Sequence, residues 1–173
     1  GYAQLVQGER PDVTVIMWSA MNLPVYRERV EQRHGIEFPP GGAQGRSQWF
    51  ARTALARGYD VFVDPNQFAI LAAFPTYPHG ILFRVLPGGT PLPSAKQLFA
   101  LNKALYETFD LHYALPSADA DWPVHVHERY VRMWQIIRNA LVAEGDRDDA
   151  GVAHEIAMRL WPRAATSESG PSS

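Results

Sequence analysis

The sequence contains no cysteine, no long apolar run and no excess of positive charge. Without cysteine the chain forms neither a disulfide nor a cysteine-ligated metal site, and thiolate catalysis is excluded. Its 16 basic and 18 acidic residues give a net charge of −2, so no general positive field attracts nucleic acid. We therefore expect no nucleic-acid partner.

The longest uninterrupted apolar run extends only from Phe68 to Phe74. Because a helix that crosses a bilayer needs about 20 apolar residues, we expect no membrane span. No charged segment followed by an apolar stretch opens the chain, so no signal peptide is expected. The abrupt start at Gly1 leads us to expect a piece cut from a longer protein.

The composition is that of an ordinary globular protein. Of the 173 residues, 46% are hydrophobic and 20% are charged, which is enough apolar material for a buried core. This length suits one domain, or one domain with a small helical appendage.

Strand-like and helical segments alternate in the first half of the chain. Val13 to Trp18 is a nearly continuous apolar run of strand length, which is typical of a strand buried on both faces of a parallel sheet. Helices are predicted over 25–34 and 48–57, and strands over 60–64 and 80–86. A strand, a helix pair and a strand form a right-handed crossover unit. The pattern thus predicts an α/β fold with a small, mostly parallel sheet and crossover helices.

Local signals define the ends of these segments. Asn22 and Ser47 are expected to cap the two helices, and Gly35 and Gly58 to end them. The run 68–74 is left open between a short helix and a buried strand, because periodicity does not separate the two at this length.

Only helices are predicted after the break at 87–93, over 94–109, 122–144 and 148–160. The last two form a helical hairpin that turns at Gly145. We therefore expect an α/β, Rossmann-like domain over 1–90, a helical extension over 91–163, and a disordered tail over 164–173 that is small and polar.

The C-terminal hairpin has the residue spacing of one tetratricopeptide unit, although Arg138 and His154 depart from the motif. The matching positions are Trp134, Ile137, Ala150, Ala157 and Pro162. Because a solenoid needs about three stacked units, we interpret the segment as one hairpin docked on the α/β part.

Two segments resemble a metal site and a phosphate loop, but neither has the spacing that such a site needs. His125 and His127 are two residues apart, so on a helix they point to nearly opposite sides and do not converge on a metal. The glycine-rich segment 41–47 has neither the spacing nor the lysine of a phosphate loop. No nucleophile elbow or dinucleotide fingerprint is present either. We therefore assign no catalytic residue, no metal ligand and no cofactor.

The predicted parallel sheet suggests a place for a ligand, because ligands of open parallel sheets bind at the carboxyl ends of the strands. Ser19 and Asn22 follow the first strand, and Asp64 and Asn66 follow the second. These four residues form the candidate ligand rim. A helix cap at Asn22 and a turn at Asp64 and Asn66 explain the same residues without a ligand.

Five tryptophans suggest stacking against sugar rings. Trp18 and Trp134 lie on apolar segments and are interpreted as core. Trp122 and Trp161 lie near predicted helix ends, where we expect exposure. A sugar site needs a pocket beside one of them.

The segment from Tyr2 to Ile16, with its Gly-x-Arg-Pro-Asp-Val turn, resembles bacterial polytopic membrane proteins of the GT-C glycosyltransferase class, in the protein O-mannosyltransferase-like group. The segments 60–64 and 77–84 and the helical hairpin are similar to that group too. The resemblance implies an extracytoplasmic, periplasmic domain of a membrane-embedded parent. In this class the catalytic acidic residue lies between early membrane helices. The chain lacks those helices, so none of its residues inherits a catalytic role.

Three functions follow as hypotheses. The resemblance favours a non-catalytic accessory domain that positions a glycan or an acceptor protein, or stabilises the membrane part. One alternative is an interaction module that recruits a partner through the C-terminal helices. The other is a free-standing enzyme that acts on a sugar or nucleotide.

Overall fold

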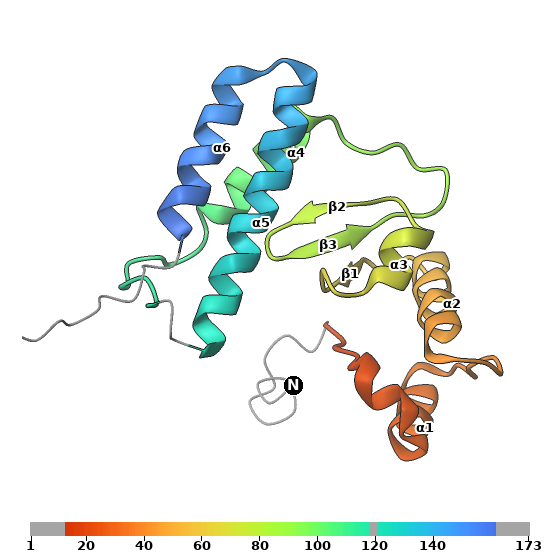
Figure 1. Cartoon of the computed structure of the whole chain (residues 1–173). Helices are drawn as coiled ribbons and strands as arrows, with labels where there is room; N and C mark the ends of the chain where they lie inside the picture. The colour runs from red at the N-terminus through yellow and green to blue at the C-terminus, as the bar shows by residue number, and fades with distance from the viewer. Residues whose placement is uncertain (1–12, 118–120, 162–173) are drawn as a thin grey trace, which may run out of the picture.

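The structure is a computed structural model that describes residues 13–117 and 121–161. In these residues the chain is mostly helical, with six α-helices, one short 3-10 helix and a three-stranded sheet (Figure 1). In chain order the elements are η2 (Trp18–Asn22), α1 (Pro24–His34), α2 (Ala43–Ala56), β1 (Val61–Val63), α3 (Phe68–Ala73), β2 (Thr76–His79), β3 (Leu82–Val85), α4 (Ala95–Tyr106), α5 (Asp121–Glu144) and α6 (Arg147–Leu160). The predicted tail over 164–173 lies outside the described residues.

The sheet is antiparallel with the strand order β1-β3-β2, so the predicted parallel, Rossmann-like α/β fold is wrong. The reason lies in β2, which the sequence did not indicate. Two residues, Gly80 and Ile81, join β2 to β3, and so short a connection permits only an antiparallel pair. Gly80 has a φ of 63°, in the left-handed region that glycine adopts readily.

The predicted strand over Val13–Trp18 is also absent. Residues 13–17 belong to no helix or strand, and they lead into η2, which begins at Trp18. Val15 is 60% exposed and Met17 is 61% exposed, so the run is not buried on both faces. Ile16 and Trp18 pack with Met21 in a cluster that also contains Val30 and Phe38.

The helix starts differ from the predicted caps. Leu23, not Asn22, precedes α1, and Pro24 is its first residue. Helix α2 begins at Ala43, so Ser47 lies inside it, buried, and donates its hydroxyl hydrogen bond to the carbonyl of Gln44 at 2.7 Å. Much of the glycine-rich segment 41–47 is therefore helix. The ambiguous run 68–74 forms the helix α3.

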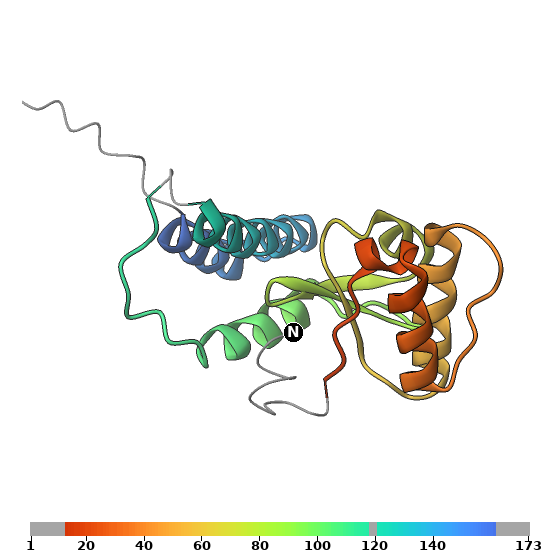
Figure 2. The same ribbon diagram turned by 90° about the horizontal axis from the view of Figure 1, so that it is seen from below.

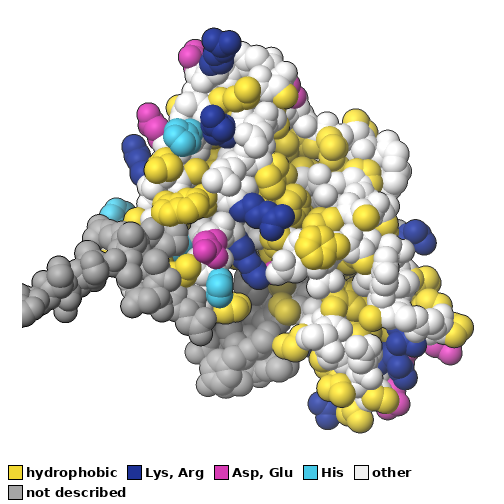
Figure 3. Space-filling view, in the orientation of Figure 1, with side chains coloured by type: hydrophobic (Ala, Val, Ile, Leu, Met, Phe, Trp, Pro, Cys, Tyr) yellow, Lys and Arg dark blue, Asp and Glu magenta, His cyan; other side chains and the backbone are white. Residues whose placement is uncertain are grey.

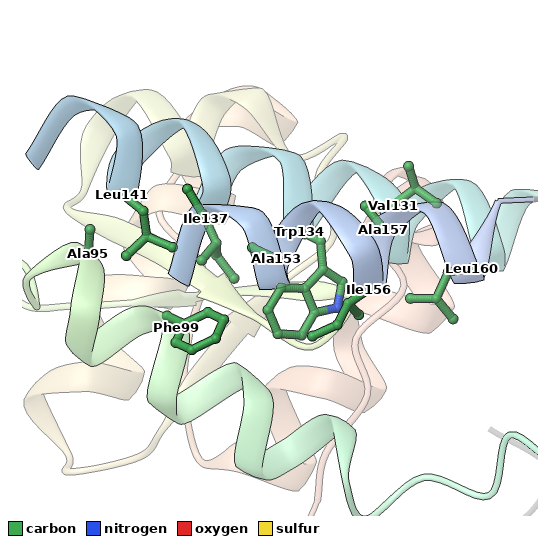
Figure 4. Close-up of a cluster of buried hydrophobic side chains, with 11 residues drawn as sticks. Ala95, Phe99, Val131, Trp134, Ile137, Leu141, Ala153, Ile156, Ala157 and Leu160 are labelled. Carbon is green, nitrogen blue, oxygen red and sulfur yellow. The ribbon is translucent and has the colours of Figure 1, made fainter. Parts of the chain in front are cut away.

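Helices α5 and α6 form the C-terminal hairpin, which turns at Gly145 with a φ of 84°. Helix α4 covers the inner face of this hairpin, and its start is fixed by a capping box between Ser94 and Gln97. Figure 4 shows Phe99 of α4 beside Trp134 of α5, where the rings meet edge to face at 6.1 Å. The shared core is formed by Ala95, Phe99, Val131, Trp134, Ile137, Leu141, Ala150, Ala153, Ile156, Ala157 and Leu160. Of the tetratricopeptide positions, Pro162 lies outside the described residues.

The sheet lies between two groups of helices (Figure 2). One face contributes Val63 and Val85 to a core with Ala51 of α2 and Ile70 of α3. Helices α4 and α5 pack against β2 from the other side of the molecule. The turn that follows β1 is thereby brought close to the first half of α5. None of the described helices is long and apolar enough to cross a bilayer.

Candidate functional site

A groove of about 440 Å³ lies between the first half of α5 and the turn after β1; we call it the α5 groove. Figure 3 shows that basic, acidic and histidine side chains gather on this face, over α5. The groove is lined by Pro65, Asn66, Trp122, His125, Glu128, Arg129 and Arg132.

Helical periodicity explains why α5 presents these side chains together. Residues three or four apart on a helix are neighbours on one face, and Trp122, His125, Glu128 and Arg132 follow that spacing. The opposite stripe of α5, which includes Val131 and Trp134, is buried against α4 and α6. One helix thus contributes both to the core and to the α5 groove.

Asp64 connects the turn to α5. Its Oδ2 lies 2.7 Å from Nη1 of Arg129, and the two side chains are only 31% and 28% exposed, respectively. Its Oδ1 accepts a hydrogen bond from the backbone N–H of Asn66 at 2.9 Å, which is the pattern of an Asx turn. The carboxylate therefore fixes both Arg129 and the turn that carries Asn66.

The remaining lining residues offer different chemistry. Trp122, near the start of α5, is 68% exposed. Glu128 Oε2 lies 3.3 Å from Nδ1 of His125. Arg132 has no hydrogen-bond or ion-pair partner among the described residues. The groove therefore combines an aromatic face, hydrogen-bond acceptors and an unpaired guanidinium.

The structure divides the four residues of the predicted ligand rim. Ser19 and Asn22 are exposed on η2, which packs against α1 and α2. Asp64 and Asn66 are joined at the edge of the α5 groove. The rim was predicted at the carboxyl ends of parallel strands. The sheet is antiparallel, so these ends do not bring the two pairs together. Ligand binding by these residues stays a prediction.

The two histidines of α5 lie on different sides, as their spacing predicted. His125 is exposed, whereas His127 is only 3% exposed. The ring nitrogens of His127 lie 3.0 Å from the carbonyl of Leu160 and 3.0 Å from the hydroxyl of Tyr113. This histidine ties α5 to the end of α6. Within the described residues no cluster of three histidine or acidic side chains is placed to hold a metal.

Part of the groove was predictable from the sequence. It indicated exposure of Trp122, which the structure confirms, and it picked out Asp64 and Asn66. It missed Arg129 and Arg132. The pairing of Asp64 with Arg129 joins residues 65 positions apart, and such a contact leaves no local pattern. The polar face of α5 was the available signal.

Comparison of the chain with known protein families, with curated proteins and with solved structures found no significant match. Evidence on function therefore comes from the geometry of the α5 groove.

Proposed function

We propose that this chain is a non-catalytic accessory domain that holds a glycan in the α5 groove, as the extracytoplasmic part of a GT-C-like membrane protein. One observation carries the proposal: the exposed indole of Trp122 lines a concave site together with polar side chains. The sequence had suggested sugar stacking without a pocket beside the tryptophan. The α5 groove provides this pocket beside Trp122.

The chemistry of the lining fits a sugar. The flat indole presents an apolar face with a polar N–H at its edge, which suits the C–H face of a pyranose ring. Asn66 and Glu128 provide acceptors for hydroxyl groups, and the arginines provide donors. The volume lies within the roughly 300–1,000 Å³ that is usual for small-molecule sites.

The same lining argues against sugar hydrolysis. A glycosidase needs two carboxyl groups that flank the scissile bond. Here Asp64 is bound to Arg129 and to the Asn66 backbone, and Glu128 lies at hydrogen-bond distance from His125. Binding without chemistry is the better account. The parent's transfer reaction would take place in the membrane part, as the resemblance implies.

Recruitment of a partner by the C-terminal hairpin is less favoured. The inner face of the hairpin, which includes Trp134 and Ile137, is buried against α4 (Figure 4). The exposed apolar side chains that remain, such as Val142, Val152 and Met158, are spread along α5 and α6. The concavity of about 290 Å³ between α4 and α6 is lined by charged side chains as well as apolar ones, among them Lys96, Lys103, Glu107 and Asp149.

The proposal is tested by calorimetric titration of the 173-residue chain with a panel of neutral and acidic oligosaccharides. We expect at least one to bind, and Trp122→Ala to weaken that binding at least tenfold, about 1.4 kcal/mol. Trp161→Ala is the matched control, because Trp161 is also exposed, at 52%, but does not line the groove. It should leave the affinity unchanged.

Thermal unfolding of each variant checks that the fold is intact. The proposal is wrong if no oligosaccharide binds the folded chain. It is also wrong if Trp122→Ala and Trp161→Ala bind the same ligand equally well.

A further inference from the structure

Arg132 lines the groove without an ion-pair partner among the described residues. The charge of Arg129 is balanced by Asp64 at 2.7 Å. Glu128 lies four residues before Arg132, the usual spacing for a helical ion pair, yet its oxygen is directed to His125 at 3.3 Å. Arg132 therefore keeps a charged guanidinium without a partner among the described residues.

The two arginines also form a pair of like charges. Arg129 and Arg132 are three residues apart, so their Cβ atoms lie about 5–6 Å from each other on the same face of α5. Like charges at this spacing repel each other and destabilise a helix. Asp64 relieves part of this repulsion because it pairs with Arg129. An anion bound beside Arg132 relieves the rest, and guanidinium groups suit carboxylates and phosphates because of their fork of donors.

We propose that the α5 groove selects an oligosaccharide that carries an anionic group, a carboxylate or a phosphate, and that Arg132 binds this group while Trp122 stacks on a neighbouring ring. This inference rests on the proposed function. Beyond that function, it specifies that the ligand is anionic and how many sugar rings it spans at least.

The distance along the helix sets that size. Trp122 and Arg132 are ten residues apart on α5, which corresponds to about 15 Å at 1.5 Å per residue. This separation of the two helix positions exceeds the width of one hexose ring. The ligand therefore spans at least two rings, with one on the indole and the anionic one near Arg132.

Arg129 has a separate role in this arrangement. Its ion pair with Asp64 is partly buried, so its guanidinium is held at the wall of the groove. Arg129 is therefore a positioning residue that joins the turn to α5. Arg132 is the residue that recognises the anion.

The test compares three probes on the full chain: a neutral glucose trisaccharide, the same trisaccharide with one ring oxidised to a uronic acid, and its 6-phosphate. We expect the wild-type chain to bind at least one acidic probe tenfold or more tightly than the neutral one. This preference should fall as the salt concentration rises. The uronic acid and the phosphate distinguish the two sources of negative charge.

Arg132→Gln should remove the preference, so that the acidic and the neutral probes bind this variant with equal affinity. Arg138→Gln is the matched control, because Arg138 is exposed on the same helix but does not line the groove. It should keep the preference.

The outcomes separate the two proposals. If the neutral probe binds through Trp122 as tightly as both acidic ones, or if Arg132→Gln keeps the preference, the inference is wrong and the proposed function stands. If none of the three probes binds the folded chain, nor does any other oligosaccharide of the panel, both are wrong.

Discussion

At the scale of single residues, Asn102 of α4 connects the helices to the sheet. It is only 5% exposed. Its side-chain N–H groups donate to the carbonyls of Pro78 and Leu98 at 2.9 Å, and its oxygen accepts from the backbone N–H of Gly80 at 2.9 Å. The β2–β3 turn is thus fixed against α4 by one side chain. Its buried backbone groups depend on this partner.

Asn102→Ala should therefore destabilise the chain markedly. It leaves the N–H of Gly80 and the carbonyl of Pro78 without the partner they have here, and each such loss costs about 1–3 kcal/mol. We expect the free energy of unfolding in urea to fall by about 2–4 kcal/mol. Asn139→Ala, at an exposed position of α5, should change it by less than about 0.5 kcal/mol. Equal effects of both substitutions would contradict this account.

His79 makes the stability of the sheet depend on pH. Its ring lies 5.2 Å from that of Phe62, and its Nδ1 is buried without a hydrogen-bond partner among the described residues. Burial lowers the pKa of His79 below its ordinary value of 6.5; the charge of Arg84 lowers it further, whereas Asp60 raises it. The folded chain therefore holds this histidine neutral.

The sign of the pH effect follows from proton binding. As the pH falls below about 6.5, the unfolded chain takes up the proton before the folded chain does, so the free energy of unfolding decreases. His79→Gln should make the loss of stability between about pH 7.5 and pH 5 smaller. His154→Gln, on the exposed face of α6, is the control. Urea unfolding at both pH values measures the difference, and an unchanged pH dependence in His79→Gln would overturn this role.

Part of the α5 groove was predictable from the types of single residues. The short polar side chains of Asp64 and Asn66 around a proline indicate a turn, and the structure has the expected Asx hydrogen bond. Arg129 and Arg132 resemble any other charged residues of a solvated helix. What distinguishes them is the segment they meet, which is set by tertiary packing.

At the scale of the elements, helices were predicted better than strands. The helix that begins after Ser94 and the hairpin turn at Gly145 both depend on local signals, and both lie where they were predicted. The sheet depends on pairing between segments, for which a single sequence has no local pattern. Thr76–His79 contains a proline and a histidine and does not resemble a strand. Because β2 was missed, β3 was predicted to lie parallel to the other strands, whereas it pairs antiparallel with both β1 and β2.

Substitution by alanine should change the stability of the chain in opposite directions at two glycines of the hairpin. Gly145 has a φ of 84°, and a Cβ there meets nothing within 4 Å. Gly145→Ala therefore costs only backbone strain, about 1–2 kcal/mol. Gly151 lies inside α6, has no positive φ, and leaves the same open space. Gly151→Ala should stabilise the chain by about 0.5–1 kcal/mol. Thermal unfolding measures both, and a shift of both melting temperatures in one direction would contradict this assignment.

At the scale of the whole molecule, the α5 groove needs both halves of the chain. The turn after β1 belongs to the part predicted as a domain over 1–90, and α5 to the helical extension over 91–163. Helices α4 and α5 hold the sheet so that Asp64 reaches Arg129. A site built this way follows from the relative placement of the two parts. The predicted parallel sheet brought Ser19 and Asn22 together with Asp64 and Asn66, whereas in the structure only the second pair lies beside the groove.

The proposed function depends on one contact, the stacking of a sugar ring on Trp122 in the α5 groove. The five tryptophans give five indole N–H signals in a ¹⁵N-labelled sample, so each ring reports on its own surroundings. The signals are followed by NMR while the chain is titrated with an oligosaccharide that binds. We expect a saturable shift of the Trp122 signal. The signals of buried Trp134 and exposed Trp161 should not change. A bound oligosaccharide that leaves the Trp122 signal in place, or that shifts Trp161 instead, would contradict it.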